Sequence, residues 1–283
     1  MNMLVNLNDI LMDAQEKGYA VGLFNTTDTD ALEAVISVAE ELRSPVIIGT
    51  AEVLLPYGEL QLIGPAMINM AKNASVPVAV HYDHGLTADR CREALQLGFS
   101  SIMYDCSNDA YEDNVRRVRE MVDLAHSLGA TVEGELGHVG DNVDSKEGDC
   151  HIEDPSRFYT DPAMAEDFVN RTGIDALAIA IGTAHGTYTC KPKLDIERLK
   201  EIRAQIDTPL VLHGGSGLTV CDLHACIANG ITKVNIFTDM YLAGKAAMAD
   251  QSGDYHEIRT RKVMAIKEVV REKILTFGSN GRA

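Results

Sequence analysis

The chain has 283 residues, of which 46% are hydrophobic and 24% are charged, with 23 Gly and 8 Pro. This composition is ordinary for a globular α/β protein and excludes disordered, collagen-like and coiled-coil chains. The 25 Lys and Arg residues face 42 Asp and Glu residues, so the formal net charge is −17. Such a charge disfavours nucleic acid or an anionic membrane as a partner, because both would be repelled.

The sequence carries no pattern of a membrane or secreted protein. Its longest apolar runs, such as residues 176–182, are far shorter than the roughly 20 residues of a membrane span. The first thirteen residues contain no Lys or Arg, so the basic start of a secretory signal is missing. The six cysteines form no CxxC pair, which argues against a disulfide scaffold. We therefore expect a cytoplasmic protein.

Short runs rich in Val, Ile and Ala alternate with longer amphipathic stretches, the pattern of repeated βα units. The predicted strands are residues 19–25, 45–50, 77–82, 101–105, 131–136, 176–182, 209–213 and 233–238. Helices are predicted in several of the intervening stretches, among them residues 30–42, 109–128, 162–172 and 195–205. Eight parallel strands close a barrel, so the sequence predicts an α/β fold, a (β/α)8 TIM barrel forming one domain over residues 1–283.

Two further segments lie outside this repeated βα pattern. An additional C-terminal helix is expected near residues 265–277. The connection over residues 137–157 is about twenty residues long, which exceeds the usual length of such connections. It is expected to be either a functional lid or disordered.

Histidines follow three of the predicted strands. Active sites of such barrels lie at the carboxyl ends of the strands, where His84, His185 and His213 stand. Three imidazoles with an open fourth position describe a catalytic zinc site, so these are the predicted ligands. Asp83, beside one ligand, is placed to move a proton on the substrate, or alternatively to orient a ligand.

Other polar residues share the same end of the barrel. By strand alternation His81 faces the same side as Asp83, where it is expected to support the site or the core. Asp105 and Glu135 end two further strands, with Glu133 on the same face as Glu135. These carboxylates are expected either to hydrogen-bond the histidines or to offer an alternate metal position.

A phosphate site is predicted next to the last two strands. The turn Gly214-Gly215-Ser216 follows the seventh strand, and the segment Asn235-Ile236-Phe237-Thr238 ends the eighth. Barrels commonly hold a phosphate at these two loops. Glycine allows the backbone to approach an anion closely, so a local group of N–H donors would overcome the long-range negative charge.

With these motifs, the sequence resembles the class II, zinc-dependent ketose-bisphosphate aldolases, which include the fructose- and tagatose-bisphosphate aldolases. The resemblance covers nearly the whole chain. Its motifs are Phe24-Asn25, Asp83-His84-Gly85, Glu135-Leu136-Gly137, His185-Gly186-Thr187-Tyr188, His213-Gly214-Gly215-Ser216-Gly217 and Asn235-Ile236-Phe237-Thr238.

The resemblance implies reversible aldol cleavage of a ketose 1,6-bisphosphate to dihydroxyacetone phosphate and glyceraldehyde 3-phosphate. It implies that Asp83 gives and takes the proton, that the three histidines hold Zn²⁺, and that Na⁺ or K⁺ binds near the phosphate. Homodimers or homotetramers are usual in the family. The implied substrate-binding residues are Asn25, Gly186, Gly214, Gly215, Ser216, Asn235, Ile236, Phe237 and Thr238.

The chain departs from the family pattern where a second proton donor would be expected. The loop after the fifth strand lacks the familiar paired Glu, which leaves Asp141, Asp144 and Glu147 as candidates. Schiff-base chemistry is disfavoured, because Lys233 opens the eighth strand and would lie at the wrong end of the barrel.

A second departure concerns the distal phosphate. The family's Asp-Pro-Arg segment is missing, so Arg259 or Arg261 would have to substitute. Thr189 stands where relatives often have Lys, with Lys191 two residues on. A ketose 1-phosphate with an uncharged or carboxylate tail is therefore the alternative substrate. A non-catalytic barrel that binds sugar phosphates is a further alternative.

Overall fold

The computed structural model describes residues 2–140, 158–188 and 190–283. The strands are β1 (Leu4–Val5), β2 (Val21–Asn25), β3 (Val46–Ala51), β4 (Val78–Gly85), β5 (Ser101–Tyr104), β6 (Thr131–Leu136), β7 (Ala176–Ile179), β8 (Leu210–Leu212) and β9 (Ile231–Ile236). The helices are α1 (Leu7–Lys17), α2 (Thr29–Leu42), the 3₁₀ helix η1 (Glu52–Tyr57), α3 (Leu60–Asn73), α4 (Ala88–Leu97), α5 (Tyr111–Ser127), α6 (Pro162–Thr172), α7 (Ile196–Gln205), α8 (Val220–Ala228), α9 (Thr238–Met248) and α10 (Tyr255–Phe277).

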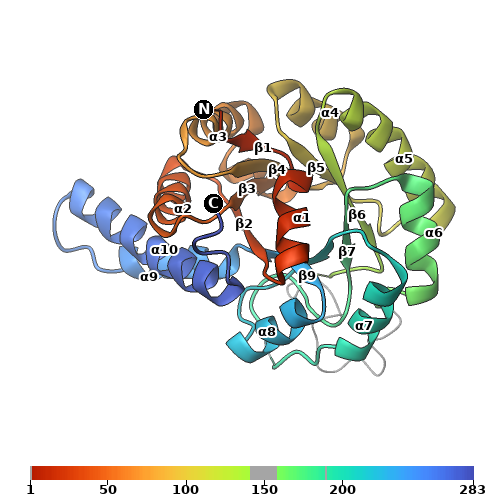
Figure 1. Ribbon diagram of the computed structural model, residues 1–283. Helices are drawn as coiled ribbons and strands as arrows, with labels where there is room; N and C mark the ends of the chain where they lie inside the picture. Colours follow the sequence, from red (N-terminus) through yellow and green to blue (C-terminus); the bar gives the residue numbers. More distant parts are fainter. Residues whose placement is uncertain (1, 141–157, 189) are drawn as a thin grey trace.

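The strands β2 to β9 form a closed parallel barrel. Each pairs with its neighbours in chain order, and β9 pairs with β2 to close the ring. Helices surround the barrel on the outside, as Figure 1 shows. The predicted TIM barrel with an additional C-terminal helix is therefore confirmed. The short β1 pairs with the first residues of β4 and adds nothing to the ring itself.

Helix α1 closes the amino-terminal mouth of the barrel, where it lies across the strands in Figure 1. Its buried residues Leu7, Ile10, Leu11 and Ala14 pack against apolar side chains from inside the barrel. The backbone N–H of Leu7 also donates to the hydroxyl of Thr131 at the start of β6 (3.2 Å). With this end filled, the opposite rim is the open end of the barrel.

The outer helices bury their apolar stripes against the strands, forming the large core between the two layers. Helix α10 begins ten residues before the predicted start, because Asp254 and Glu257 form a capping box there. Its first turns are largely exposed, so they carry no apolar periodicity that could predict them. Among the described residues, none of the helices is long and apolar enough to cross a membrane.

The eight predicted strands correspond in number and order to the barrel strands β2 to β9, but several ends differ and the short β1 was not predicted. Strand β4 continues three residues beyond the predicted end, to Gly85, and β9 begins two residues earlier, at Ile231. Strand β7 ends at Ile179, three residues before the predicted end. Because the extension of β4 carries the Asp83-His84-Gly85 motif, this difference bears directly on the site.

Candidate active site

The site is a cavity of about 490 Å³ at the open rim of the barrel. One wall is apolar and comes from the residues around η1 and the end of β4. The polar residues come from the ends of β2, β4, β8 and β9 and from the loops that follow the strands. The described lining residues are Asn25, Ala51, Val53, Leu54, Asp83, His84, Leu86, Asp105, Asn108, His138, Val139, Gly140, His185, Gly186, Gly214, Ser216, Asn235, Ile236, Phe237 and Thr238.

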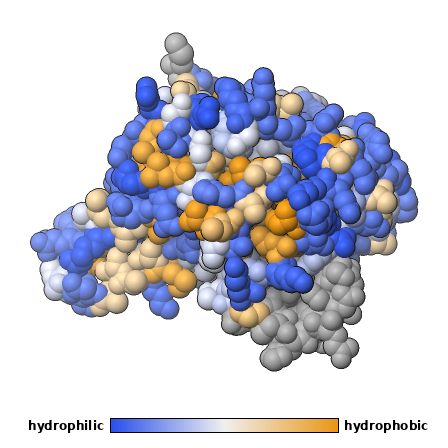
Figure 2. Space-filling view, turned by 60° about the horizontal axis from the view of Figure 1, so that its bottom comes forward, coloured by the Kyte–Doolittle hydropathy of each residue, from blue (hydrophilic) through white to orange (hydrophobic). Residues whose placement is uncertain are grey.

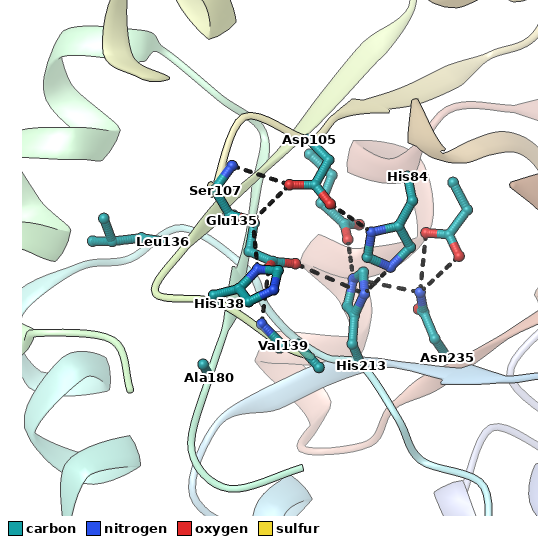
Figure 3. Close-up of polar contacts among 12 residues, drawn as sticks. His84, Asp105, Ser107, Glu135, Leu136, His138, Val139, Ala180, His213 and Asn235 are labelled. Atoms are coloured by element: carbon teal, nitrogen blue, oxygen red, sulfur yellow. Dashed lines mark hydrogen bonds and ion pairs between the residues drawn. The ribbon is translucent and has the colours of Figure 1, made fainter. Parts of the chain in front are cut away.

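Three histidines from distant parts of the chain meet at this cavity: His84 and His185 line it, and His213 is fully buried beside them. One ring nitrogen of each of His84, His185 and His213 lies within 4.8 Å of the other two. The nitrogens His84 Nε2 and His213 Nδ1 are 2.7 Å apart, and the two rings stand perpendicular to each other (Figure 3). A set of three imidazole nitrogens at this spacing fits a divalent transition metal, above all zinc.

His84 reaches this cluster through an irregular backbone. On a regular strand it would point away from the side that Asp83 faces. However, the pairing of β4 with β5 shifts register between Tyr82 and Gly85, and His84 has a φ of 42°. Left-handed backbone at a residue other than Gly is strained and is often found at functional sites. The strain allows consecutive residues, Asp83 and His84, to face the same cavity.

Carboxylates accept hydrogen bonds from the ring nitrogens of His84 and His213 that face away from the cluster. Asp105 accepts from His84 Nδ1 (2.9 Å) and is itself held by the hydroxyl of Ser107 (2.7 Å). Glu133 accepts from His213 Nε2 (2.8 Å). These hydrogen bonds leave His84 Nε2 and His213 Nδ1 directed toward the centre of the cluster. Such outer partners fix the tautomer and orientation of metal-binding histidines.

The electrostatics of the two rings are consistent with a shared proton. Burial opposes the charge on His84, but the nearby carboxylates of Asp83 and Asp105 raise its pKa to about 10. Burial and the charge on His84 lower the pKa of His213 to about 4. A charged His84 therefore donates to a neutral His213, in the position where a divalent cation would bind both nitrogens.

Asp83 is fixed beside the histidines by two amides. Asn25 Nδ2 donates to Asp83 Oδ2 (2.7 Å), and Asn235 Nδ2 lies 3.1 Å from Oδ1. The carboxylate is only 1% exposed. Burial disfavours its charge, but the nearby rings of His84 and His81 hold the pKa of Asp83 well below its usual range. Asp83 is therefore ionised, the form in which a carboxylate can act as a proton acceptor.

His81 lies directly below Asp83 inside the barrel and is fully buried. Its Nδ1 is 2.8 Å from the hydroxyl of Ser101, and its Nε2 is 3.7 Å from Asp83 Oδ1. It does not line the cavity. His81 thus supports the carboxylate from beneath, on the shared face that strand alternation predicts.

Asp105 and Glu135 form a second cluster with His84, again with donor atoms within 4.8 Å of one another. Burial and the charge of Asp105 raise the pKa of Glu135 to about 8. One oxygen of Glu135 accepts from the backbone of Val139 (3.1 Å), whereas Oε2 has no hydrogen-bond partner among the described residues. These residues could therefore either orient the histidines or hold a cation in a second position.

The loops after β7 and β8 and the start of α9 form another side of the cavity, which carries few large side chains. Tyr188 ties two rim loops together, since its hydroxyl accepts from Ala184 N (3.0 Å) and donates to the Gly214 carbonyl (2.8 Å). The Ser216 hydroxyl oxygen accepts from the backbone N–H groups of Phe237 and Asp239 (3.2 and 3.3 Å) at the start of α9. A helix amino terminus with small neighbours is a favourable position for an anion.

Three comparisons place the chain among known proteins. Residues 5–282 match the family described as fructose-bisphosphate aldolase class-II. The chain belongs to this family. The uncharacterized protein YdjI of Escherichia coli K12 is 40% identical over 99% of this chain and 100% of its own. The fructose-bisphosphate aldolase of Staphylococcus aureus Mu50 is 37% identical over 99% of both chains.

A solved structure agrees with this assignment. The crystal structure of the YdjI aldolase superposes with a TM-score of 0.89 at 36% identity and covers 99% of this chain and 100% of that chain. Members of the class II aldolase family are lyases that act on sugar phosphates and are typically metal-dependent. The chain is therefore an enzyme of this class.

Several sequence predictions need correction or lie outside the described residues. Lys233 is not the first residue of its strand, and its ammonium reaches inward to Glu133 (2.7 Å). Gly215 does not line the cavity, since its N–H donates to the Asn235 carbonyl (3.1 Å). The suggested second proton donors Asp141, Asp144 and Glu147, and also Thr189, fall outside the described residues.

The basic residues suggested for a distal phosphate lie elsewhere in this class II aldolase. Arg259 pairs with Asp30 and Glu33 of α2. Arg261 donates to backbone carbonyls of the α9–α10 connection. Lys191 is 72% exposed and lies 3.8 Å from Asp222. None of the three lines the cavity.

Sequence reasoning missed several residues that line the cavity, of which His138 is the one with a titratable side chain. His138 lines the cavity with Nδ1 3.1 Å from the Ser107 hydroxyl and 3.8 Å from Glu135 Oε1. Its position directly after the Glu135-Leu136-Gly137 motif was the available signal. Figure 3 shows it beside Glu135, on the same side of the site as His213.

Proposed function

We propose that this enzyme catalyses the reversible aldol cleavage of a ketose 1-phosphate to dihydroxyacetone phosphate and an aldehyde, with Zn²⁺ held by His84, His185 and His213. The observation that carries the proposal is the meeting of three imidazoles with an ionised Asp83 at one cavity. A nitrogen-rich donor set of this kind selects zinc over magnesium or calcium. When bound, the metal supplies Lewis acidity that polarises the substrate carbonyl.

Asp83 moves the proton in this proposal. In the cleavage direction its carboxylate takes the proton of the C4 hydroxyl, the C4–O bond becomes a carbonyl, and the C3–C4 bond breaks with its electron pair passing to C3. A proton delivered to C3 by a second acid then completes dihydroxyacetone phosphate. In synthesis Asp83 returns the proton to the new hydroxyl. Asn25 and Asn235 hold the carboxylate in one orientation, so little rearrangement is needed during the transfer.

The 1-phosphate would lie at the start of α9. Gly186, Gly214, Ser216 and Thr238 line this end of the cavity with little side-chain bulk. The amino terminus of α9 adds N–H donors and the positive end of its dipole. Phosphate at this position would place C2 and C3 of the ketose toward the histidines.

Relatives named fructose-bisphosphate aldolase support a 1,6-bisphosphate of the fructose or tagatose type as the substrate. A specific observation favours a second candidate, a ketose 1-phosphate that ends in an uncharged or acidic group. Among the described residues that line the cavity there is no Lys or Arg. A distal phosphate would therefore lack a cationic partner within that part of the chain.

A homo-oligomer is also proposed. Helices α9 and α10 project from the barrel, and Figure 2 shows hydrophobic surface on this lobe. Its large exposed apolar residues are Tyr241, Leu242, Met248, Tyr255 and Met264. Apolar surface of this kind is typical of protein contacts.

The test is a panel of ketose monophosphates and bisphosphates, with triose-phosphate release measured before and after treatment with a chelator. We expect cleavage that is lost on chelation and restored by Zn²⁺. Release of product that survives complete metal removal would exclude the metal-dependent mechanism. Binding of sugar phosphates without turnover by the zinc-loaded protein would support the non-catalytic alternative instead.

A further inference from the structure

Below the three histidines lies a fully buried ion pair that the proposed reaction does not use. Lys233 on β9 and Glu133 on β6 are both 0% exposed, and Lys233 Nζ is 2.7 Å from Glu133 Oε2. Among the described residues, Glu133 is the one carboxylate within 4 Å of this ammonium. Burying such a pair is costly, so its presence inside the barrel calls for an explanation.

The second oxygen of Glu133 provides the connection to the site. Glu133 Oε1 accepts from His213 Nε2 at 2.8 Å, which places the proton of the neutral ring on Nε2 and leaves Nδ1 as the nitrogen with a lone pair. That Nδ1 is directed toward His84 Nε2. The chain Lys233–Glu133–His213 therefore runs from the barrel interior to the centre of the histidine cluster.

The two supporting carboxylates of the cluster differ in their surroundings. The Asp105 side chain, which holds His84, is 9% exposed and receives hydrogen bonds from Ser107. Glu133 has no exposure and lies in the interior of the barrel. An ionised carboxylate at that depth needs a compensating charge, and Lys233 supplies it.

Other roles for Lys233 fit less well. Its Nζ does not line the cavity, so it cannot attack a carbonyl group held there. His81 Nε2 also lies 3.9 Å from Glu133 Oε2, which means that the same carboxylate faces the ring beneath Asp83. Lys233 thus stands behind both the ligand His213 and the ring that supports the base.

We propose that Lys233 is a positioning residue of the metal site. Its ammonium fixes the carboxylate of Glu133, which in turn holds the His213 ring with Nδ1 toward the metal. Lys233 touches neither the metal nor the substrate. This inference rests on the proposed function, in which the three histidines bind a divalent ion.

The experiment measures zinc affinity by competition with a chromophoric chelator, and the visible spectrum of the Co²⁺-substituted protein, for Lys233→Met. Methionine keeps the length of the side chain and removes its charge. We expect zinc affinity to fall roughly 10–100-fold, the usual effect of losing an outer partner of a metal ligand, together with a changed Co²⁺ spectrum. A folded Lys233→Met variant with wild-type affinity and spectrum would overturn the proposal.

Two further variants make the test specific. Lys262→Met removes a lysine ammonium that is paired with Asp28 and Asp30 and does not line the cavity, so it should leave zinc affinity unchanged. If Lys233→Met does not fold, the double variant Lys233→Met with Glu133→Gln leaves no uncompensated buried charge. We expect it to bind zinc roughly 10–100-fold more weakly than the wild type, and wild-type affinity in this variant would also overturn the role of Lys233.

Zinc binding by the wild-type protein distinguishes failure of the proposed function from failure of the positioning role of Lys233. A wild-type protein that binds no zinc at the three histidines, checked with His185→Ala, would defeat the proposed function itself. Zinc binding by the wild type that Lys233→Met fully retains would defeat only the positioning role.

Discussion

Asn25 Nδ2 lies 2.7 Å from Asp83 Oδ2, so an amide at the end of β2 donates to the carboxylate near the end of β4 across the rim of the barrel. Because β3 lies between these strands, the contact links two strands that do not pair with each other. Asn25 was expected only to bind substrate. In the structure it also orients the group that is proposed to carry the proton.

Removal of the proposed base should separate turnover from metal binding. We expect Asp83→Ala to lower triose-phosphate release by roughly 10²–10⁴-fold, the typical contribution of general acid–base catalysis. Zinc content should stay at the wild-type level, because the histidine nitrogens are untouched. Turnover close to that of the wild type would refute the role of Asp83.

Asn25→Ala should lower kcat while the fold persists. A hydrogen bond to a charged group is worth about 1.5–3 kcal/mol, which corresponds to roughly 10–100-fold in rate if the whole interaction is used in the transition state. Asn8→Ala is a matched control, since Asn8 Nδ2 donates to the Asp175 carboxylate on the protein surface (2.8 Å). Steady-state kinetics measures the effect, and an equal decrease in kcat for Asn25→Ala and Asn8→Ala would contradict the prediction.

Gly214→Ala should destabilise the protein and weaken phosphate binding. Gly214 has a φ of 64°, and an added Cβ would lie 2.4 Å from the Ala184 carbonyl oxygen. Gly129→Ala is the control, because Gly129 has a similar φ of 76° with nothing within 4 Å of a Cβ. In both variants the positive φ of the replaced glycine costs about 1 kcal/mol of stability. Only in Gly214→Ala does the new Cβ also clash with the Ala184 carbonyl oxygen. Urea unfolding and the KM for the sugar phosphate measure the two effects, and equal losses would exclude the steric argument.

The ion pair between Asp28, at the N-cap of α2, and Lys262 of α10 should stabilise the protein less in acid. Burial raises the pKa of Asp28, but hydrogen bonds from Lys262 and from the Ala31 N–H outweigh it and lower that pKa below its usual 3.8. A lowered pKa in the folded state adds stability above pH 3.8, and this contribution is lost as the pH falls through the folded-state value.

Asp28→Asn keeps an acceptor for the α2 N-cap and removes the charge. We therefore expect it to be less stable than the wild type near neutral pH and to approach wild-type stability below pH 3.8. Urea unfolding of the metal-free protein across this range measures the difference. A constant difference at all pH values would show that the charge of Asp28 contributes nothing.

Much of this architecture could be predicted from the sequence, because buried parallel strands read as apolar runs and their polar ends mark the rim. The order and number of barrel strands follow from that pattern. The positions of His84, His185 and His213 after separate strands likewise indicated that they would meet. Helix α1, by contrast, follows no predicted strand, and its role in closing the barrel depends on tertiary contacts.

Details that depend on local distortion or on long side chains could not be predicted. The left-handed backbone of His84 arises from a register shift that leaves no compositional mark. The contact of Lys233 with Glu133 could not be predicted, because strand position alone does not say where a long side chain inside the barrel finds its partner. The position of His138 depends on the path of the chain after β6, which the sequence pattern did not specify.

The packing of α1 into the barrel determines where substrate enters and where products leave. Because aliphatic side chains fill the amino-terminal end of the barrel, substrate and both products must enter and leave the cavity by the opposite rim.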